Sequence, residues 1–308
     1  MSAATAISPK LTVVIVTYRS KETIAPTLDA LKAAYDEKLV DIVVIDNASN
    51  DGTADFVAQR YPFVALVRNR ENIGFGRACN QGFDHSTTPY VLLLNPDAVL
   101  SLGPMKILVD FMDRTRRAGI CAPAVRRTSG SLQAAGNLPN PLTVMLSPMF
   151  SRWTMRGQKP IAPGGAPDRT EWICGSIMLV RKDMLKEIGA FDPRFFLYFE
   201  ETDLCHRAHG AGWEIWTVGE AVGEHMNAAS AATTDSVMHG DTIAEHYYRS
   251  RYYYLTKHFG RIAAATAEIG ELAFLGLRTV IDRIRGKERK TLEQRLRAPV
   301  MKLPSPVE

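Results

Sequence analysis

Short apolar runs rich in β-branched residues alternate with segments of helical periodicity over the N-terminal third of the chain. This alternation constrains the fold more than any other feature. The runs at 11–16, 42–45, 64–67 and 90–94 are almost wholly apolar, which is typical of strands buried on both faces of a parallel sheet. Between them, apolar residues recur at helical spacing, as at Ile24, Leu28 and Leu31. The pattern predicts an α/β fold with a mostly parallel sheet flanked by helices.

Three of these expected strands end in polar clusters. Thr17 and Tyr18 follow the first, Asp46 and Asn47 the second, and Asn95-Pro96-Asp97 the fourth. Ligands of open α/β sheets bind outside the carboxyl ends of the strands, so we expect an active site at this edge. A carboxylate at a strand tip, such as Asp46, can accept a hydrogen bond from the ring N–H of uracil or thymine. The residues that follow, 50–53, are explained by a turn and a helix N-cap.

The segment from Asn72 to Asn80 contains Gly74-x-Gly76 between an expected strand and a helix, which invites a dinucleotide-binding interpretation. We reject it, because Cys79 stands where the third glycine belongs and the segment does not follow the first strand. Backbone N–H groups at a helix start still suit a phosphate or a sugar.

Three carboxylates, Glu200, Glu201 and Asp203, come directly after the aromatic run 195–199. Carboxylates against an apolar surface and beside like charges acquire raised pKa values, which makes a general base near neutral pH. The alternative is an ordinary helix N-terminus, where acidic residues are favoured by the helix dipole.

Two further features are candidates for ligand contact. Asp97 is a candidate ligand for a hard divalent cation that holds a diphosphate, and His225 is a plausible second ligand in a mixed oxygen and nitrogen set. Gly175 would let a ligand approach the backbone closely, although a glycine at a β-bulge explains it equally well.

Composition excludes several classes of protein. The net charge of +4 is mild and does not indicate nucleic-acid binding. The four cysteines include no C-x-x-C pair, which favours a reducing compartment, and the first ten residues lack the apolar region of a signal peptide. We therefore expect a cytoplasmic protein. Residues 261–297 form an amphipathic, basic helical region that either contacts the membrane peripherally or packs on protein.

The expected organisation is a flexible tail at 1–10, a catalytic domain at 11–225, a helical region at 226–297 and a second tail at 298–308. Within the catalytic domain, residues 123–170 are rich in proline and glycine, and we expect a long irregular binding loop with a short hairpin near 128–133. Further strands are expected at 172–181 and 214–218.

Taken together, these motifs resemble glycosyltransferase family 2, in particular its rhamnosyltransferase branch. The matching stretches occur in the family's order over about residues 11–225, and they lie at 14–18, 46–53, 72–80, 93–97, 130–133, 175–176 and 195–207.

The resemblance implies a GT-A fold and inverting transfer from a nucleotide-diphosphate sugar, dTDP- or UDP-linked, to a hydroxyl of a lipid-linked or growing polysaccharide. It also implies a Mn²⁺ or Mg²⁺ cofactor at Asp97, the last position of the family's D-x-D motif, completed by His225. Glu201 falls at the position of the catalytic base, where the family commonly has Asp, and Glu200 and Asp203 are alternatives. The expected donor-binding residues are Thr17, Tyr18, Asp46, Asn47, Asn72, Gly74, Asn80, Asn95 and Gly175.

Two departures from the family pattern, Asn95 in place of Asp and Glu201 in place of Asp, support an alternative hypothesis. The chain would then be a non-catalytic nucleotide-sugar-binding or scaffold module of a glycan assembly complex, which binds a donor without metal-dependent turnover.

Overall fold

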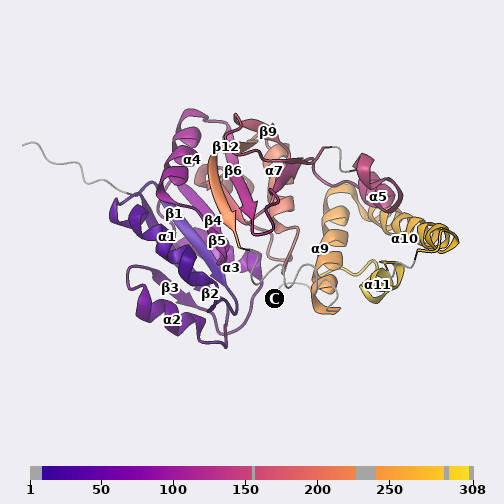
Figure 1. The fold of residues 1–308 in the computed structure, drawn as a ribbon, viewed down its shortest axis with the longest axis horizontal. Coiled ribbons are helices and arrows are strands. Elements are labelled where there is room, and N and C mark those ends of the chain that lie inside the picture. Colours follow the sequence, from indigo (N-terminus) through magenta and orange to yellow (C-terminus); the bar gives the residue numbers. More distant parts are fainter. Residues whose placement is uncertain (1–8, 155–156, 227–240, 288–290, 305–308) are drawn as a thin grey trace, which may run out of the picture.

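The computed structural model describes residues 9–154, 157–226, 241–287 and 291–304. Figure 1 shows a sheet with helices on both faces and a group of helices at one side of it. The strands of the sheet are β1 (Leu11–Thr17), β2 (Val40–Asp46), β3 (Ala65–Arg68), β4 (Tyr90–Leu94), β5 (Ala98–Val99), β6 (Ala118–Arg127), β9 (Asp168–Thr170), β11 (Ile177–Arg181) and β12 (Glu214–His225). The helices are α1 (Ile24–Asp36), α2 (Thr53–Arg60), α3 (Phe75–His85), α4 (Leu102–Arg114), α5 (Pro141–Thr154), α6 (Lys182–Ile188), α7 (Glu200–Gly210), α9 (Asp241–Phe259), α10 (Arg261–Ile284) and α11 (Thr291–Arg297).

The strand order is β3-β2-β1-β4-β11-β6-β12-β5, with β9 paired to β12. Strands β3, β2, β1 and β4 are parallel, β11 runs antiparallel between β4 and β6, and β12 is parallel to β6. The carboxyl ends of β1, β2, β4 and β12 therefore lie at one edge of the sheet. The predicted α/β fold, a large sheet flanked by helices, is confirmed.

Side chains of β1 alternate between the two faces of the sheet, as the two-residue period of a strand requires. Val13 and Ile15 pack in a core with apolar residues of α1, α2 and α4. Val14 and Val16 pack in a second core with those of α3, α6 and α7. Because both faces are covered, β1 is buried along its whole length, which explains why its sequence is apolar without alternation.

A third core joins the aromatic run to the C-terminal helices. Phe195 and Phe199, which are 0% and 8% exposed, pack with Tyr252, Tyr253 and Tyr254 of α9. The ring centroids of Phe195 and Tyr253 lie 4.9 Å apart. The segment that leads into α7 is thus fixed by aromatic contacts to a helix far away in the sequence.

Buried ion pairs hold α9, α10 and α11 together. Arg251 of α9 donates to Glu268 (2.6 Å) and Glu271 (2.7 Å) of α10, and Arg295 of α11 contacts both carboxylates. All four side chains are almost completely buried. Within the described part of the chain, no helix is long and apolar enough to cross a membrane.

The segment 123–170 differs from the expected irregular loop. The hairpin is present, since the backbone N–H of Arg127 donates to the carbonyl of Ser131 (2.9 Å). The first residues of the segment, 123–127, form the end of β6. The segment also contains a helix, α5, which packs on α10. Two of its strands, β7 (Ala134–Gly136) and β8 (Lys159–Pro160), form a second small sheet with β10 (Trp172–Ile173), which follows the segment. The expected strand at 172–181 is accordingly two strands, β10 and β11, and the one expected at 214–218 continues to residue 225. Burial against α10 stabilises α5 despite Pro148 and the kink at Phe150.

Close packing of α3 on β1 yields a test of the fold. A Cβ added to Gly82 would lie 2.3 Å from Cγ1 and 3.1 Å from Cβ of buried Val14, so no rotamer of Val14 relieves the clash. We expect Gly82→Ala to lower the free energy of unfolding by about 1–3 kcal/mol. A Cβ at Gly276, within α10, meets no atom within 4 Å, and Gly276→Ala should raise stability by up to about 1 kcal/mol. Urea unfolding of both variants checks the pair, and equal effects would contradict the packing argument.

Candidate active site

The ends of β1 and β2 place Thr17, Tyr18 and Asp46 side by side, as the sequence predicted. The hydroxyl of Thr17 donates to Asp46 Oδ1 (3.0 Å), and the backbone N–H of Ser49 donates to Oδ2 (3.0 Å). Asp46 is 3% exposed, whereas the ring of Tyr18 is 46% exposed. A buried, oriented carboxylate next to an exposed aromatic ring suits a planar, polar ligand such as a nucleobase.

Asn47 lies beside Asp46 but faces the loop before α3. Its Oδ1 accepts from Asn69 Nδ2 and from the backbone N–H of Ile73, both at 3.1 Å, and its Nδ2 donates to Asn72 Oδ1 (2.7 Å). The side chains of Asn47 and Asn72 therefore hold the loop in shape. Any contact that they make with a ligand would come in addition to these bonds.

Asn80 and Gly74 both fasten α3 to the segment before α7. The side-chain amide of Asn80 donates to the carbonyl of Phe191 (2.8 Å) and accepts from its N–H (3.0 Å). Gly74 has φ +88°, and a Cβ there would lie 2.6 Å from the carbonyl oxygen of Phe196. Only glycine fits at this contact. Sequence reasoning placed both residues at the donor, and the structure gives both a packing role.

Asp97, in the turn before β5, comes together with His225, the last residue of β12. His225 pairs with Ala98 in the antiparallel β5–β12 ladder, and His225 Nε2 lies 3.0 Å from Asp97 Oδ1. Both side chains are nearly buried, at 9% and 2% exposed. Asn95 lies at the same edge, where its N–H donates to the carbonyl of Ser176 (2.9 Å), and its side chain is half-buried.

The Asp97–His225 pair fits a divalent cation in the chemistry of its donors, a carboxylate oxygen and an imidazole nitrogen. No group of three or more His, Cys, Asp or Glu side chains that could hold a metal occurs among the described residues. A diphosphate carries oxygen atoms that would complete the coordination of a cation bound at this pair.

Glu200 and Glu201 occupy the first turn of α7. The two residues before them, Tyr198 and Phe199, have φ of 68° and 66°, a left-handed conformation that is costly for aromatic residues and that concentrates at functional sites. Glu200 is 5% exposed, and its Oε2 has no hydrogen-bond partner among the described residues. Burial, and then the charge of Glu201, raise the pKa of Glu200 well above its usual range.

Glu201 is less enclosed and is oriented by its neighbours. Its Oε1 lies 3.5 Å from the hydroxyl of Thr202, which accepts a hydrogen bond from Trp172 Nε1 (3.0 Å). Burial raises the pKa of Glu201 as well. Gly175 lies against this side chain, because a Cβ added there would be 3.6 Å from Glu201 Cβ. The structure thus brings the predicted Gly175 and Glu201 together, and it adds Trp172 as a neighbour that sequence reasoning did not identify.

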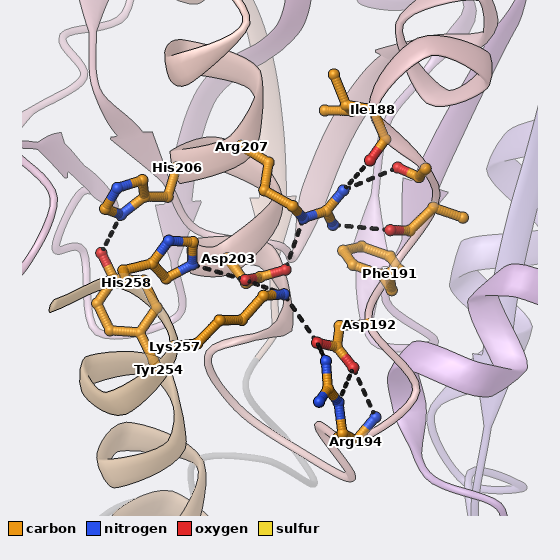
Figure 2. Close-up of polar contacts among 12 residues, drawn as sticks. Ile188, Phe191, Asp192, Arg194, Asp203, His206, Arg207, Tyr254, Lys257 and His258 are labelled. Atoms are coloured by element: carbon orange, nitrogen blue, oxygen red, sulfur yellow. Dashed lines mark hydrogen bonds and ion pairs between the residues drawn. The ribbon is translucent and has the colours of Figure 1, made fainter. Parts of the chain in front are cut away.

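Asp203 is turned away from Glu201, because residues two positions apart lie on different faces of a helix. Figure 2 shows its carboxylate surrounded by Arg207 of α7 and by Lys257 and His258 of α9, at 2.7–2.8 Å. Burial alone would raise the pKa of Asp203, but the hydrogen bond from His258 and the charges of Arg207 and Lys257 outweigh it and lower the pKa. These contacts make Asp203 part of the link between α7 and α9.

Other polar residues near the site were missing from the expected set. Lys257 also contacts Asp192 Oδ2 (2.8 Å), which accepts from the hydroxyl of Tyr253 as well (2.9 Å). The buried amide of Gln133 accepts from the Ser176 hydroxyl (2.7 Å) next to Gly175. The motifs that contain Gln133 and Ser176 were recognised, but their pairing depends on strand register and is invisible in the sequence.

A cavity of about 890 Å³ opens elsewhere, between the small sheet, β9 and the C-terminal end of α7, with Arg169, His209 and Glu214 in its wall. None of its lining residues is one of the carboxylates of α7 or of the Asp97–His225 pair. The candidate catalytic and metal-binding residues therefore lie outside this cavity.

The buried carboxyl of Glu200 generates a stability prediction. Since its pKa is raised in the folded state, the unfolded chain ionises first, and stability is lost as pH rises through the folded pKa. Glu200→Gln removes this loss, so we expect its Tm to exceed that of the native chain at pH 7–8 and the difference to shrink towards pH 4. Thermal unfolding across this pH range is the measurement. A difference that grows at low pH would contradict the assignment.

Comparison with known proteins identifies the family of the chain. The family model described as Glycosyl transferase family 2 matches residues 12–189. An N-acetylglucosaminyl-diphospho-decaprenol L-rhamnosyltransferase of Mycobacterium tuberculosis is 31% identical over 310 aligned positions, which cover 92% of this chain and 98% of the relative. Rhamnosyltransferase WbbL of Escherichia coli is 24% identical over 65% of this chain and 77% of its own length.

Solved structures show the same fold. The mannosyltransferase PcManGT of Pyrobaculum calidifontis, in complex with GDP-Man and Mn²⁺, superposes with a TM-score of 0.55 at 17% identity, covering 95% of this chain and 85% of that one. TarS of S. aureus superposes with a TM-score of 0.53 at 14% identity, covering 93% and 89%. With its GT-A type sheet, its match to the family model and its similarity to rhamnosyltransferases, the chain belongs to glycosyltransferase family 2.

Proposed function

We propose that this protein transfers a sugar, with inversion at the anomeric carbon, from a nucleotide-diphosphate donor to a hydroxyl of a lipid-linked or growing polysaccharide. One observation carries the proposal: a base-like glutamate pair and a cation-suited Asp97–His225 pair come from distant segments to the same end of the β4–β11 strand pair. Leu94 pairs with Ile177 at this end, Asp97 follows Leu94 by three residues, and Glu201 lies against Gly175, two residues before Ile177. Asn95 and Ser176, joined by a backbone hydrogen bond, lie between them. Donor activation and acceptor deprotonation need groups of these two kinds.

The rhamnosyl donor and the lipid-linked acceptor are taken from the relative of M. tuberculosis, whose name states both an L-rhamnosyltransferase activity and a diphospho-decaprenol acceptor. In our proposal Thr17, Tyr18 and Asp46 hold the base and ribose of a dTDP- or UDP-linked sugar. The same proposal assigns the catalytic unit to residues 11–225.

Glu201 is the residue that we assign as the general base. It has a raised pKa, it is less enclosed than Glu200, and it faces Gly175, where the backbone leaves room for a substrate. In an inverting displacement it takes the proton of the acceptor hydroxyl as the oxygen attacks. Glu200 lies behind it in a tighter environment, and Asp203 is engaged by cations.

The departing diphosphate gathers negative charge. Mn²⁺ or Mg²⁺ bound by Asp97 and His225 would neutralise it there. In this proposal the side-chain amide of Asn95 donates a hydrogen bond to a phosphate oxygen or a sugar hydroxyl. Asp97 supplies the negative charge that holds the cation, so residue 95 needs no charge of its own. The aromatic core around Phe195 and Phe199 holds the first turn of α7 and keeps water away from the base.

The alternative, a non-catalytic donor-binding or scaffold module, rests on the two departures from the family pattern, Asn95 and Glu201, each in place of Asp. It predicts that the donor binds and is never turned over. The raised pKa values of Glu200 and Glu201 favour the enzyme, because a scaffold has no use for two carboxyls held in a costly environment.

Replacement of the base tests the catalytic assignment. We expect Glu201→Gln to lower kcat by about 10²–10⁴-fold while donor affinity is kept, because the amide cannot accept the acceptor's proton. Sugar transfer and donor binding are measured separately, and Glu220→Gln, at an exposed site on β12, is the matched control. The rate of the native enzyme should fall with decreasing pH, with its midpoint above about 4.3, the usual pKa of Glu. A fully active Gln variant would remove Glu201 from the mechanism.

A donor panel tests the activity itself. The purified protein is incubated with Mn²⁺ or Mg²⁺ and with UDP- and dTDP-sugars, with and without a lipid-linked N-acetylglucosamine acceptor. We expect release of nucleoside diphosphate from one donor, dependent on the acceptor and abolished by EDTA. Asp97→Asn should lower this rate at least about tenfold, because it weakens the cation site. Donor binding without release under any condition would support the scaffold module.

A further inference from the structure

We propose that α10, together with its neighbours α5 and α11, docks on an anionic lipid bilayer through an exposed apolar face bordered by arginine and lysine. This inference rests on the proposed function in one respect, since it supplies the surface on which a lipid-linked acceptor would be presented.

Exposed large apolar side chains are concentrated in one part of the molecule. Among the described residues, every one except Tyr18 lies in α5 or from Phe259 onwards. In Figure 1, α5, α10 and α11 lie together at the side of the molecule away from β1, β2 and β3. Apart from Tyr18, the residues concerned are Leu142, Phe150, Phe259, Ile262, Ile269, Leu277, Val280, Ile284, Leu296, Val300, Met301 and Leu303.

Helix α10 carries the longest continuous part of this surface. Its exposed apolar residues follow one another at separations of seven, eight, three and four positions, which place them on one face of the helix. Thr266 and Ala273 fill the intervening positions and are exposed too. The face runs for about 33 Å at 1.5 Å per residue. Its members are Ile262 (86% exposed), Ile269 (57%), Leu277 (49%), Val280 (54%) and Ile284 (80%).

The charges of this region are sorted by sign. The three carboxylates of α10 point inward: Glu268 and Glu271 are paired with buried arginines, and Asp282 is 7% exposed. In the described part that follows α9, Glu293 is the one exposed carboxylate. The exposed cations are Arg261, Arg283, Arg285, Lys287, Arg297 and Lys302. The outer surface therefore combines apolar and positive side chains, with little negative charge to offset them.

This combination selects a bilayer over a second copy of the chain. Two copies meeting through this face would bring like charges together, whereas anionic headgroups attract them while the apolar face enters the interface. Because no described helix is suited to cross a membrane, α10 would lie in the membrane plane. Helix α9 connects this surface to the catalytic turn, since its Lys257 and His258 hold Asp203 of α7.

The test uses vesicles and the full-length protein, with no donor or acceptor present. We expect the native chain to sediment with vesicles containing phosphatidylglycerol, much less with pure phosphatidylcholine, and less at high salt. The triple variant Ile269→Asn, Leu277→Asn, Ile284→Asn should lower binding by at least about tenfold, because it removes the apolar area that enters the membrane interface. All three positions are exposed, and unchanged circular dichroism and Tm would show that the variant folds.

Charge variants supply the matched control. Arg283→Gln, Arg285→Gln and Lys287→Gln together should weaken binding to the anionic vesicles by at least about tenfold. The triple Lys32→Gln, Lys106→Gln, Lys186→Gln removes the same charge from exposed sites on α1, α4 and α6 and should leave binding unchanged.

Three results would overturn the proposal: no sedimentation of the native chain with anionic vesicles, equal sedimentation of the apolar triple variant, or a native dimer that this variant converts to a monomer. A chain that binds vesicles but transfers no sugar would leave the docking surface standing and overturn only the proposed function.

Discussion

The arrangement of the site depends on the ion pairs of the buried Asp203 carboxylate. An isolated charge without access to water is very unfavourable, and here it is compensated by Arg207, Lys257 and His258. Arg207 also donates to the carbonyls of residues 188, 189 and 190. One carboxylate thus ties together α7, α9 and the segment after α6. Since α7 begins only three residues earlier, the same network fixes the turn that carries Glu200 and Glu201.

Three neighbouring carboxylates consequently have different environments. The pKa of Asp203 is lowered because a hydrogen bond and cationic neighbours outweigh its burial, whereas burial raises the pKa values of Glu200 and Glu201, and the charge of Glu201 adds to the effect on Glu200. The helical period of 3.6 residues turns Glu201 away from Asp203, whereas Glu200 and Asp203, three positions apart, differ in the partners that surround them. A short acidic sequence can therefore supply both a structural ion pair and a candidate base, and only the packing partners distinguish the two roles.

The segment around α7 and the C-terminal helices are joined by aromatic and ionic contacts. Phe195 and Phe199 pack on the tyrosines of α9, and Arg251 of α9 is paired with the buried glutamates of α10. Packed side chains therefore run without interruption from α10 through α9 to α7. This continuity is the physical reason to consider the apolar face of α10 together with the chemistry at the sheet edge.

The sequence by itself determined the four parallel strands β1–β4 and the edge at which the site lies, but not β5, β6 or β9. Strand-length apolar runs are local signals, and the residues that follow Thr17, Asp46 and Leu94 are polar wherever parallel strands end. The sequence did not determine which side-chain amides form hydrogen bonds within the protein. The amides of Asn47, Asn72 and Asn80 hold loops in place, because their hydrogen-bond partners come from other segments. Helix α5 was missed because its stability comes from burial against α10, not from its own residues. Strand register and helix packing brought His225 to Asp97 and Lys257 to Asp203, and those long-range distances are set by the folded core.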